Sequence, residues 1–159
     1  MKSLVNLLFA LLIGCSAWSQ STESIKWHTI EEAEAAVKAD PSKKIFIDFY
    51  TVWCGPCKMM TSKTFTDQKV VKFMNEQYVC VKFNAEGAQE ATFNGNKFSN
   101  PGYDPEKANA RNAMHEFAQA HGIPGYPSYV IYDSGLNHLG TFSGYMTPDQ
   151  FLGSLGKLR

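Results

Sequence analysis

The amino-acid sequence predicts an α/β domain in which helices cover both faces of one sheet. Two observations lead to this prediction. Segments with strand-like apolar patterns alternate with segments of helical periodicity, and the last pair of strand-like segments is followed by a further helix. The expected order is helix, strand, helix, strand, helix, hairpin, helix. Such alternation is typical of α/β architectures.

The first expected pair of elements is a helix over residues 30–40 and a strand over residues 43–50. Thr29 followed three residues later by Glu32 is a capping-box signature, and the helix should end before Pro41. The strand, KKIFIDFY, is apolar along most of its length. We therefore expect it to be a central strand of the sheet.

The next expected elements are a second helix and a second strand. The helix should begin at the two cysteines of CGPC, and residues 66–77 should continue or restart it. Val70, Val71 and Met74 have the spacing of one buried helical face. The segment YVCVKFN, residues 78–84, is the second expected strand.

The C-terminal part predicts a helix, a hairpin and a final helix. Residues 104–122 are expected to be helical, with Asp104 as the cap and Pro105 at the first helical position. Two strands, residues 128–135 and 137–144, should follow around a turn at Ser134–Gly135. The final helix should cover residues 147–158.

The N-terminus has the layout of a secretory signal peptide. MKSLVNLLFALLIGCSAWSQ has a basic Lys2, an apolar run and then small residues. The run is shorter than the roughly 20 residues that span a bilayer. We expect residues 1–19 to be removed and residues 20–159 to form one exported, periplasmic domain. A lipoprotein signal that would anchor the protein to the membrane through Cys15 is the alternative.

Composition argues against nucleic acid as a partner. The chain of 159 residues has 15 Lys and Arg and 15 Asp and Glu, so its formal net charge is +0. Binding to a phosphate backbone requires a basic surface. Hydrophobic residues make up 44% of the chain, enough for a packed core.

The candidate reactive groups are Cys54 and Cys57, which lie between a strand and the start of a helix. A helix N-terminus lowers the pKa of a thiol, and the thiolate is the reactive form. Zinc would require about four ligands, and Cys80 has no cysteine partner nearby. Haem attachment would require a histidine where Lys58 stands. A purely structural disulfide remains an alternative, although so small a ring stabilises weakly. The pattern favours redox chemistry.

Asp48 is an acid within the apolar strand that precedes the cysteines. Phe46 and Tyr50 share its face, and both faces of the strand look buried. A buried carboxyl group has a raised pKa and can exchange a proton with a neighbouring thiol. Asp48 is therefore expected to act as a proton shuttle.

The residues FIDFYTVWCGPCK and HGIPGYPSYVIYDSGLNHLGTFSGYMTPDQFLGSL resemble the thioredoxin family. The resemblance implies a thioredoxin fold with a central mixed sheet. It also implies Cys54 as the attacking thiolate, Cys57 as the resolving thiol, Asp48 as the buried acid and Pro127 as a cis proline facing the cysteines. The other implied site residues are substrate-binding Trp53, Gly55, Pro56, Tyr126 and Gly144, with Lys82 and Lys58 in support.

Two features depart from the common pattern of the family. Ser62 stands where many thioredoxins have a helix-kinking proline, and the segment after it is closer to periplasmic domains that receive electrons from membrane disulfide reductases. An insertion, residues 87–112, separates the central strand–helix unit from the C-terminal half. Asn94-Gly95 within it predicts a tight turn. Surface decoration and partner recognition are both open roles for this insertion.

The resemblance implies a thiol–disulfide oxidoreductase that reduces protein disulfides outside the cytoplasm. Its expected partners are disulfide-containing proteins and a membrane disulfide reductase as electron donor, and no metal or organic cofactor is expected. A periplasmic oxidase or isomerase is one alternative. A non-enzymatic binding module that kept the fold is another.

Overall fold

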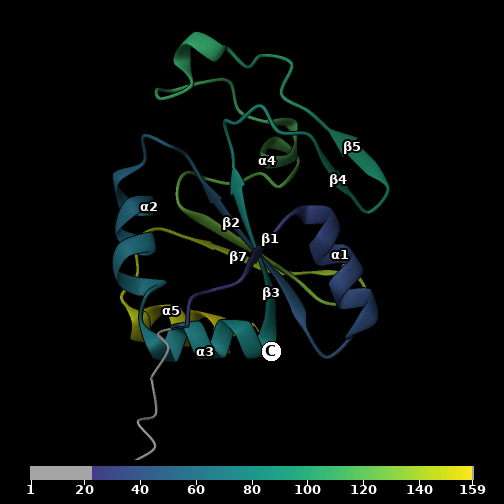
Figure 1. Ribbon diagram of the computed structural model, residues 1–159, viewed down its shortest axis with the longest axis vertical. Helices are drawn as coiled ribbons and strands as arrows, with labels where there is room; N and C mark the ends of the chain where they lie inside the picture. The colour runs from purple at the N-terminus through teal and green to yellow at the C-terminus, as the bar shows by residue number, and fades with distance from the viewer. Residues whose placement is uncertain (1–22, 159) are drawn as a thin grey trace, which may run out of the picture.

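The structure is a computed structural model that describes residues 23–158 and is built around a five-stranded sheet (Figure 1). The strand order is β1-β3-β2-β6-β7. β1, β3 and β2 are parallel, whereas β6 is antiparallel to both β2 and β7, so the sheet is mixed as expected. The strands are β1 Trp27–His28, β2 Lys44–Tyr50, β3 Tyr78–Asn84, β6 Ser128–Tyr132 and β7 His138–Ser143.

The first helix, α1 Ile30–Ala39, begins where the sequence predicts. Thr29 caps it, and the reciprocal bond from the Thr29 N–H to the Glu32 carboxylate completes the capping box. The strand β2 that follows is the middle strand of the sheet and has five consecutive buried residues. The sequence prediction of a central strand is therefore confirmed.

The second helical segment restarts rather than continues. α2 Gly55–Met59 passes into a π-helical turn, η1 Met60–Thr64, and the chain then turns before α3 Gln68–Gln77. The Asp67 carboxylate accepts bonds from the N–H groups of Lys69 and Val70, so it caps α3. The π-helical turn includes Ser62, where the family often has proline.

The prediction of one helix over residues 104–122 is wrong. The structure has a short 3₁₀ turn, η2 Pro105–Lys107, and then α4 Glu116–Ala120. Between these two elements, backbone N–H groups bond to residues that are distant in the sequence. The His115 N–H donates to the Ala85 carbonyl, and the Asn112 N–H donates to the Glu86 carboxylate. These bonds replace the helical ones, so local periodicity is overridden by tertiary contacts.

The insertion contains a small hairpin, β4 Ala91–Phe93 and β5 Asn96–Phe98. Its turn residues Asn94 and Gly95 have φ angles of 50° and 75°, which confirms the predicted tight turn. The hairpin lies beside α1 (Figure 1) and is held there by hydrogen bonds from its backbone to Glu31 and Glu34.

Two apolar cores lie on opposite faces of the sheet. α1, α4 and the hairpin cover one face, where Ile45, Ile47 and Phe49 of β2 point. α2, η1, α3 and the last helix, α5 Pro148–Gly156, cover the face of Phe46 (Figure 1). The alternation of β2 thus divides the molecule into two layers of helix around the sheet.

No helix within residues 23–158 is long and apolar enough to cross a membrane. The expected signal peptide, residues 1–19, and Cys15 lie outside the described residues.

Candidate functional site

Cys54 and Cys57 form a disulfide at the start of α2, with their Cα atoms 5.3 Å apart. Cys54 is the N-cap of the helix, and its sulfur accepts a hydrogen bond of 3.1 Å from the backbone N–H of Cys57. Pro56 lies in the first turn, where its missing N–H costs no hydrogen bond. Both cysteines are buried, with exposed fractions of 2% and 5%, so exposure does not distinguish them.

Hydrogen bonding does distinguish the two sulfurs. In the reduced protein, an N–H group that points at Cys54 and the positive end of the helix would both stabilise a thiolate there. Cys57 lies one turn further along, within the helix. The local geometry therefore favours Cys54 as the nucleophile.

Asp48 lies in the middle of the sheet and is 2% exposed. Its neighbours across β2 are Lys82 of β3 and Tyr129 of β6. Its Oδ1 atom is buried and has no hydrogen-bond partner among the described residues. Burial raises the pKa of Asp48 to about 7, although the positive charge of Lys82 opposes the shift. Near neutral pH this carboxyl group can either hold or release a proton.

Lys82 is close to Asp48 without forming an ion pair with it. Its Nζ donates to the Thr61 hydroxyl at 2.8 Å and lies over the Tyr50 ring, 5.1 Å from the centroid. A cleft of about 250 Å³ borders this lysine and also reaches Cys57. The lining of the cleft consists of Tyr50, Thr51, Val52, Cys57, Lys58, Thr61 and Lys82.

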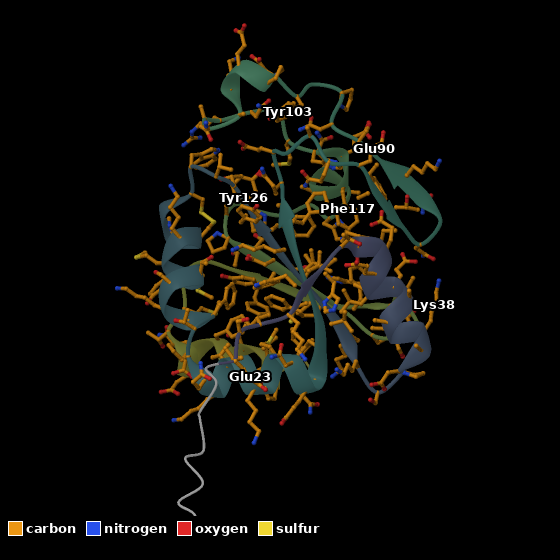
Figure 2. All side chains as sticks on the ribbon, viewed as in Figure 1. Glu23, Lys38, Glu90, Tyr103, Phe117 and Tyr126 are labelled. Carbon is orange, nitrogen blue, oxygen red and sulfur yellow. A yellow bond between two sulfur atoms is a disulfide. The ribbon has the colours of Figure 1, made fainter. Side chains whose placement is uncertain are left out.

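The loop before β6 approaches the cysteine motif from a distant part of the chain. The Tyr126–Pro127 peptide bond is cis, and the Pro127 carbonyl accepts a 2.9 Å hydrogen bond from the N–H of Gly144. The Tyr126 ring meets Trp53 edge-on, with centroids 5.8 Å apart. Figure 2 shows Tyr126 near the start of α2. Gly144 has a φ of 95°, a conformation that glycine adopts readily.

Trp53 is held by residues that the sequence analysis did not single out. Its Nε1–H donates to the Glu86 carboxylate at 2.7 Å, and the same carboxylate oxygen accepts the Asn112 N–H at 2.9 Å. The guanidinium of Arg111 lies over the indole ring, 4.2 Å from its centroid. The end of the insertion therefore packs directly against the residue that precedes Cys54.

One signal in the sequence could have indicated Glu86. It follows β3 as Trp53 follows β2, and these two strands are parallel neighbours. The carboxyl ends of parallel strands meet at one edge of a sheet, where ligand sites of α/β proteins concentrate. Arg111 and Asn112 carry no such signal, because their position depends on how the insertion packs.

The structure brings most of the predicted site residues together. Cys54, Gly55, Pro56 and Cys57 form the start of α2, and Asp48 with Lys82 lies in the adjoining strands. Lys58 is exposed and lines the cleft beside Cys57. Within residues 23–158, no group of three or more His, Cys, Asp and Glu side chains is arranged to hold a metal ion.

Comparison with known proteins identifies relatives of this chain by sequence. A family model described as a thioredoxin-like domain matches residues 30–159. Thioredoxin-1 of Drosophila melanogaster is 29% identical over 95 residues, which cover 60% of this chain and 86% of the fly protein.

Solved structures show the same fold at lower identity. The DsbH oxidoreductase is 18% identical with a TM-score of 0.57, covering 98% of this chain and 94% of its own. The oxidised C-terminal domain of DsbD from Neisseria meningitidis is 21% identical with a TM-score of 0.54, covering 81% of this chain and 91% of its own.

Proposed function

The chain belongs to the thioredoxin-like domain family and is a thiol–disulfide oxidoreductase, and we propose that it reduces disulfides of other proteins outside the cytoplasm. The observation that carries this proposal is the Cys54–Cys57 pair at the start of α2, with the Cys57 N–H directed at the Cys54 sulfur. Asp48, which lies in the adjoining strand, supplies a carboxyl group that titrates near neutral pH.

The first step is nucleophilic attack by Cys54. Its thiolate attacks one sulfur of the substrate disulfide, and a bond forms between that sulfur and Cys54 Sγ. The substrate S–S bond breaks, and the other substrate sulfur leaves as a thiolate that takes up a proton. The N–H of Cys57 is placed to stabilise the thiolate before it attacks.

The second step is resolution of the mixed disulfide by Cys57. We assign Asp48 as the group that accepts the Cys57 proton, because it is buried and its pKa of about 7 suits exchange with a thiol. The Cys57 thiolate attacks Cys54 Sγ, the bond between Cys54 and the substrate breaks, and the second substrate sulfur leaves as a thiolate that becomes a thiol by taking up the proton that Asp48 accepted. Two electrons and two protons thus pass to the substrate, and Cys54–Cys57 becomes a disulfide.

Substrate binding is assigned to the surfaces around the cysteine pair. Tyr126, Pro127 and Gly144 form one side, supported by the Gly144–Pro127 hydrogen bond and the Tyr126–Trp53 contact. Trp53, Gly55 and Pro56 form the other. An extended substrate segment would pair with the backbone next to Pro127, which is the role that the family resemblance implies.

Reduction outside the cytoplasm requires an electron donor, and we propose a membrane disulfide reductase for this role. The support is the fold shared with the DsbD C-terminal domain and the signal-like pattern of residues 1–19. Gly-Pro between the cysteines fits the reducing members of the family. The direction of electron transfer can be tested by measuring the reduction potential of the Cys54–Cys57 pair in a glutathione buffer. A reductant should have a potential near that of thioredoxin, about −270 mV, whereas an oxidant should have one nearer −120 mV.

Trapping of a mixed disulfide tests the proposal directly. Cys57→Ser should accumulate a covalent complex with a disulfide-containing protein, because resolution is blocked after the attack by Cys54. Cys54→Ser is the matched control and should trap none. Equal trapping by both variants, or full biological effect in a double Cys54→Ser, Cys57→Ser protein, would contradict the proposal and favour a binding module.

A further inference from the structure

Arg111, in the insertion, places its guanidinium over Trp53, the residue that precedes Cys54. Its guanidinium carbon is 4.2 Å from the centroid of the Trp53 ring, and Trp53 is bonded in the chain to Cys54. The Asn112 N–H that binds Glu86 fixes the backbone next to it. The arginine is therefore placed on the indole face by the fold of the insertion.

The guanidinium is held by stacking alone. Among the described residues it forms no ion pair and no hydrogen bond, and the residue is exposed. A guanidinium that lies over an aromatic ring uses its π face for that contact, so its N–H donors, which lie in the plane of the guanidinium itself, stay free to bind a carboxylate with two parallel bonds. Arg111 is thus oriented without being neutralised.

The Glu86 carboxylate also contacts Trp53, and it is occupied by other donors. One of its oxygens accepts both the Trp53 indole N–H and the Asn112 backbone N–H. Glu86 contacts the edge of the indole, whereas Arg111 lies over its face. The two charged groups bind different parts of Trp53 and do not form an ion pair.

A second cation, Lys58, lines the cleft that reaches Cys57. Lys58 follows Cys57, is exposed, and has no ion pair among the described residues. Arg111 and Lys58 carry two positive charges against the single negative charge of Glu86, so these three groups leave the surroundings of the cysteines with a net positive charge, although the whole chain has a formal net charge of +0. An approaching segment with negative charge is therefore favoured over a positive one.

We propose that Arg111 is a specificity-determining residue that binds a carboxylate next to the reacting disulfide of the substrate, so that protein disulfides flanked by acidic residues are reduced preferentially. The inference rests on the proposed function, because it assumes that Cys54 attacks a substrate disulfide. It assigns the end of the insertion to substrate recognition rather than surface decoration.

The test compares three disulfide-linked peptides that differ at one residue beside the cysteine, which is Glu, Gln or Lys. The reduced full-length protein should react with the Glu peptide about three- to tenfold faster, as a second-order rate constant for a single turnover, than with the Gln peptide. The Lys peptide should be slowest. The preference should decline as salt is raised, because an exposed ion pair is screened.

Arg111→Gln should remove most of the preference for Glu, and Arg111→Glu should reverse it towards Lys. Arg111→Lys should keep part of the preference, because it retains the charge and loses the planar fork. Lys97→Gln is the matched control: Lys97 is an exposed cation of the hairpin that forms no ion pair with any residue of 23–158, and its loss should leave the preference intact.

Neutral 2-hydroxyethyl disulfide separates this proposal from the proposed function. Arg111→Gln should reduce it as fast as the unmodified protein does. Equal rates on the three peptides, a preference that survives in Arg111→Gln, or slower reduction of the neutral disulfide by that variant would each overturn the role of Arg111. Absence of Cys54-dependent reduction of the neutral disulfide in the unmodified protein would instead overturn the proposed function.

Discussion

Asp48 is a carboxyl group in the centre of a sheet, and the surrounding protein does little to stabilise its charge. Its Oδ1 atom has no hydrogen-bond partner among the described residues, and the nearest cation, Lys82, bonds to Thr61. An acid whose pKa is raised in the folded state holds its proton longer than it does in the unfolded chain. Folding is therefore opposed whenever the pH is high enough to ionise it.

The sign of this effect fixes a pH window. The pKa rises from 3.8 to about 7 on folding, so the contribution of Asp48 to stability is present below pH 4 and is lost as the pH rises to about 7. The full loss is on the order of 4 kcal/mol. Above pH 7 both states are ionised and the contribution of Asp48 is constant.

Asp48→Asn should stabilise the protein and impair catalysis. At pH 8 we expect the free energy of unfolding to rise by about 2 kcal/mol, because a buried charge is removed. Turnover of a protein disulfide near pH 7 should fall on the order of tenfold to a hundredfold, because Cys57 loses its proton acceptor. Denaturant titrations and a pH–rate profile measure the two effects.

The two measurements distinguish the possible roles of Asp48. A stabilised variant with an unchanged pH–rate profile would contradict the proton-transfer role. It would show that the buried charge of Asp48 only destabilises the fold. A destabilised variant at pH 8 would show that the carboxylate has a partner that compensates its burial.

α4 is a short helix whose N-cap residue, His115, is held in place by a hydrogen bond to Gln89, outside the helix. His115 is fully buried at the N-cap, where its Nδ1 accepts the Phe117 N–H at 3.0 Å and its Nε2–H donates to the Gln89 carbonyl at 2.6 Å. Only the neutral ring can accept at one nitrogen and donate at the other. Burial lowers the pKa of His115, although the bond to Gln89 opposes the shift.

Acid should weaken this end of α4. A histidine whose pKa is lowered on folding takes up its proton more readily in the unfolded chain, so its contribution to stability is lost as the pH falls below about 6.5. His115→Asn keeps a side-chain acceptor at the N-cap and removes the ionisable ring. The fall in unfolding free energy between pH 7 and pH 5 should be smaller in this variant.

The comparison must be made between proteins at the same pH, because Asp48 changes stability in the opposite direction over this range. Subtracting the unmodified protein cancels that contribution. His138→Asn, which changes an exposed histidine of β7, is the control and should follow the unmodified protein. An identical pH dependence in His115→Asn and the unmodified protein would contradict the assignment.

At the scale of the whole molecule, Phe117 joins the insertion to the sheet. It is fully buried, and its ring contacts Phe49 of β2, Phe83 of β3, and Phe93 and Phe98 of the hairpin. A two-stranded hairpin in isolation is at best marginally stable, so this hairpin needs contacts with the rest of the molecule. Its position, and that of the rest of the insertion, depends on this aromatic contact.

Phe117→Ala should lower the free energy of unfolding by about 3–5 kcal/mol, because it leaves a cavity where four rings meet. It should also increase hydrogen exchange at the amides of residues 91–98. Phe151→Ala is the matched control on the opposite face, where an equally buried ring packs against Phe46 and Phe65. A similar loss of stability without added exchange in the hairpin is expected there, and equal hairpin exchange in both variants would contradict the role of Phe117.

Much of this fold could be predicted from local sequence features. The Thr29–Glu32 capping box, the apolar run of β2 and the Asn94-Gly95 turn each depend on residues a few positions apart, and each appears where expected. The prediction of a helix over residues 104–122 was wrong because contacts with distant residues decide the structure there. Its periodicity was adequate, but Asn112 and His115 bond to Glu86 and Ala85, which lie far away in the sequence.

The sequence by itself determined the chemistry of the site: the two cysteines at a helix start and the acid on a buried face of β2 follow from spacing and alternation alone. Only the tertiary structure decided what surrounds them. Trp53, Glu86 and Arg111 meet because parallel strands end at one edge and the insertion folds back over it. Contacts between distant segments depend on the packing of the whole core, which local periodicity does not encode.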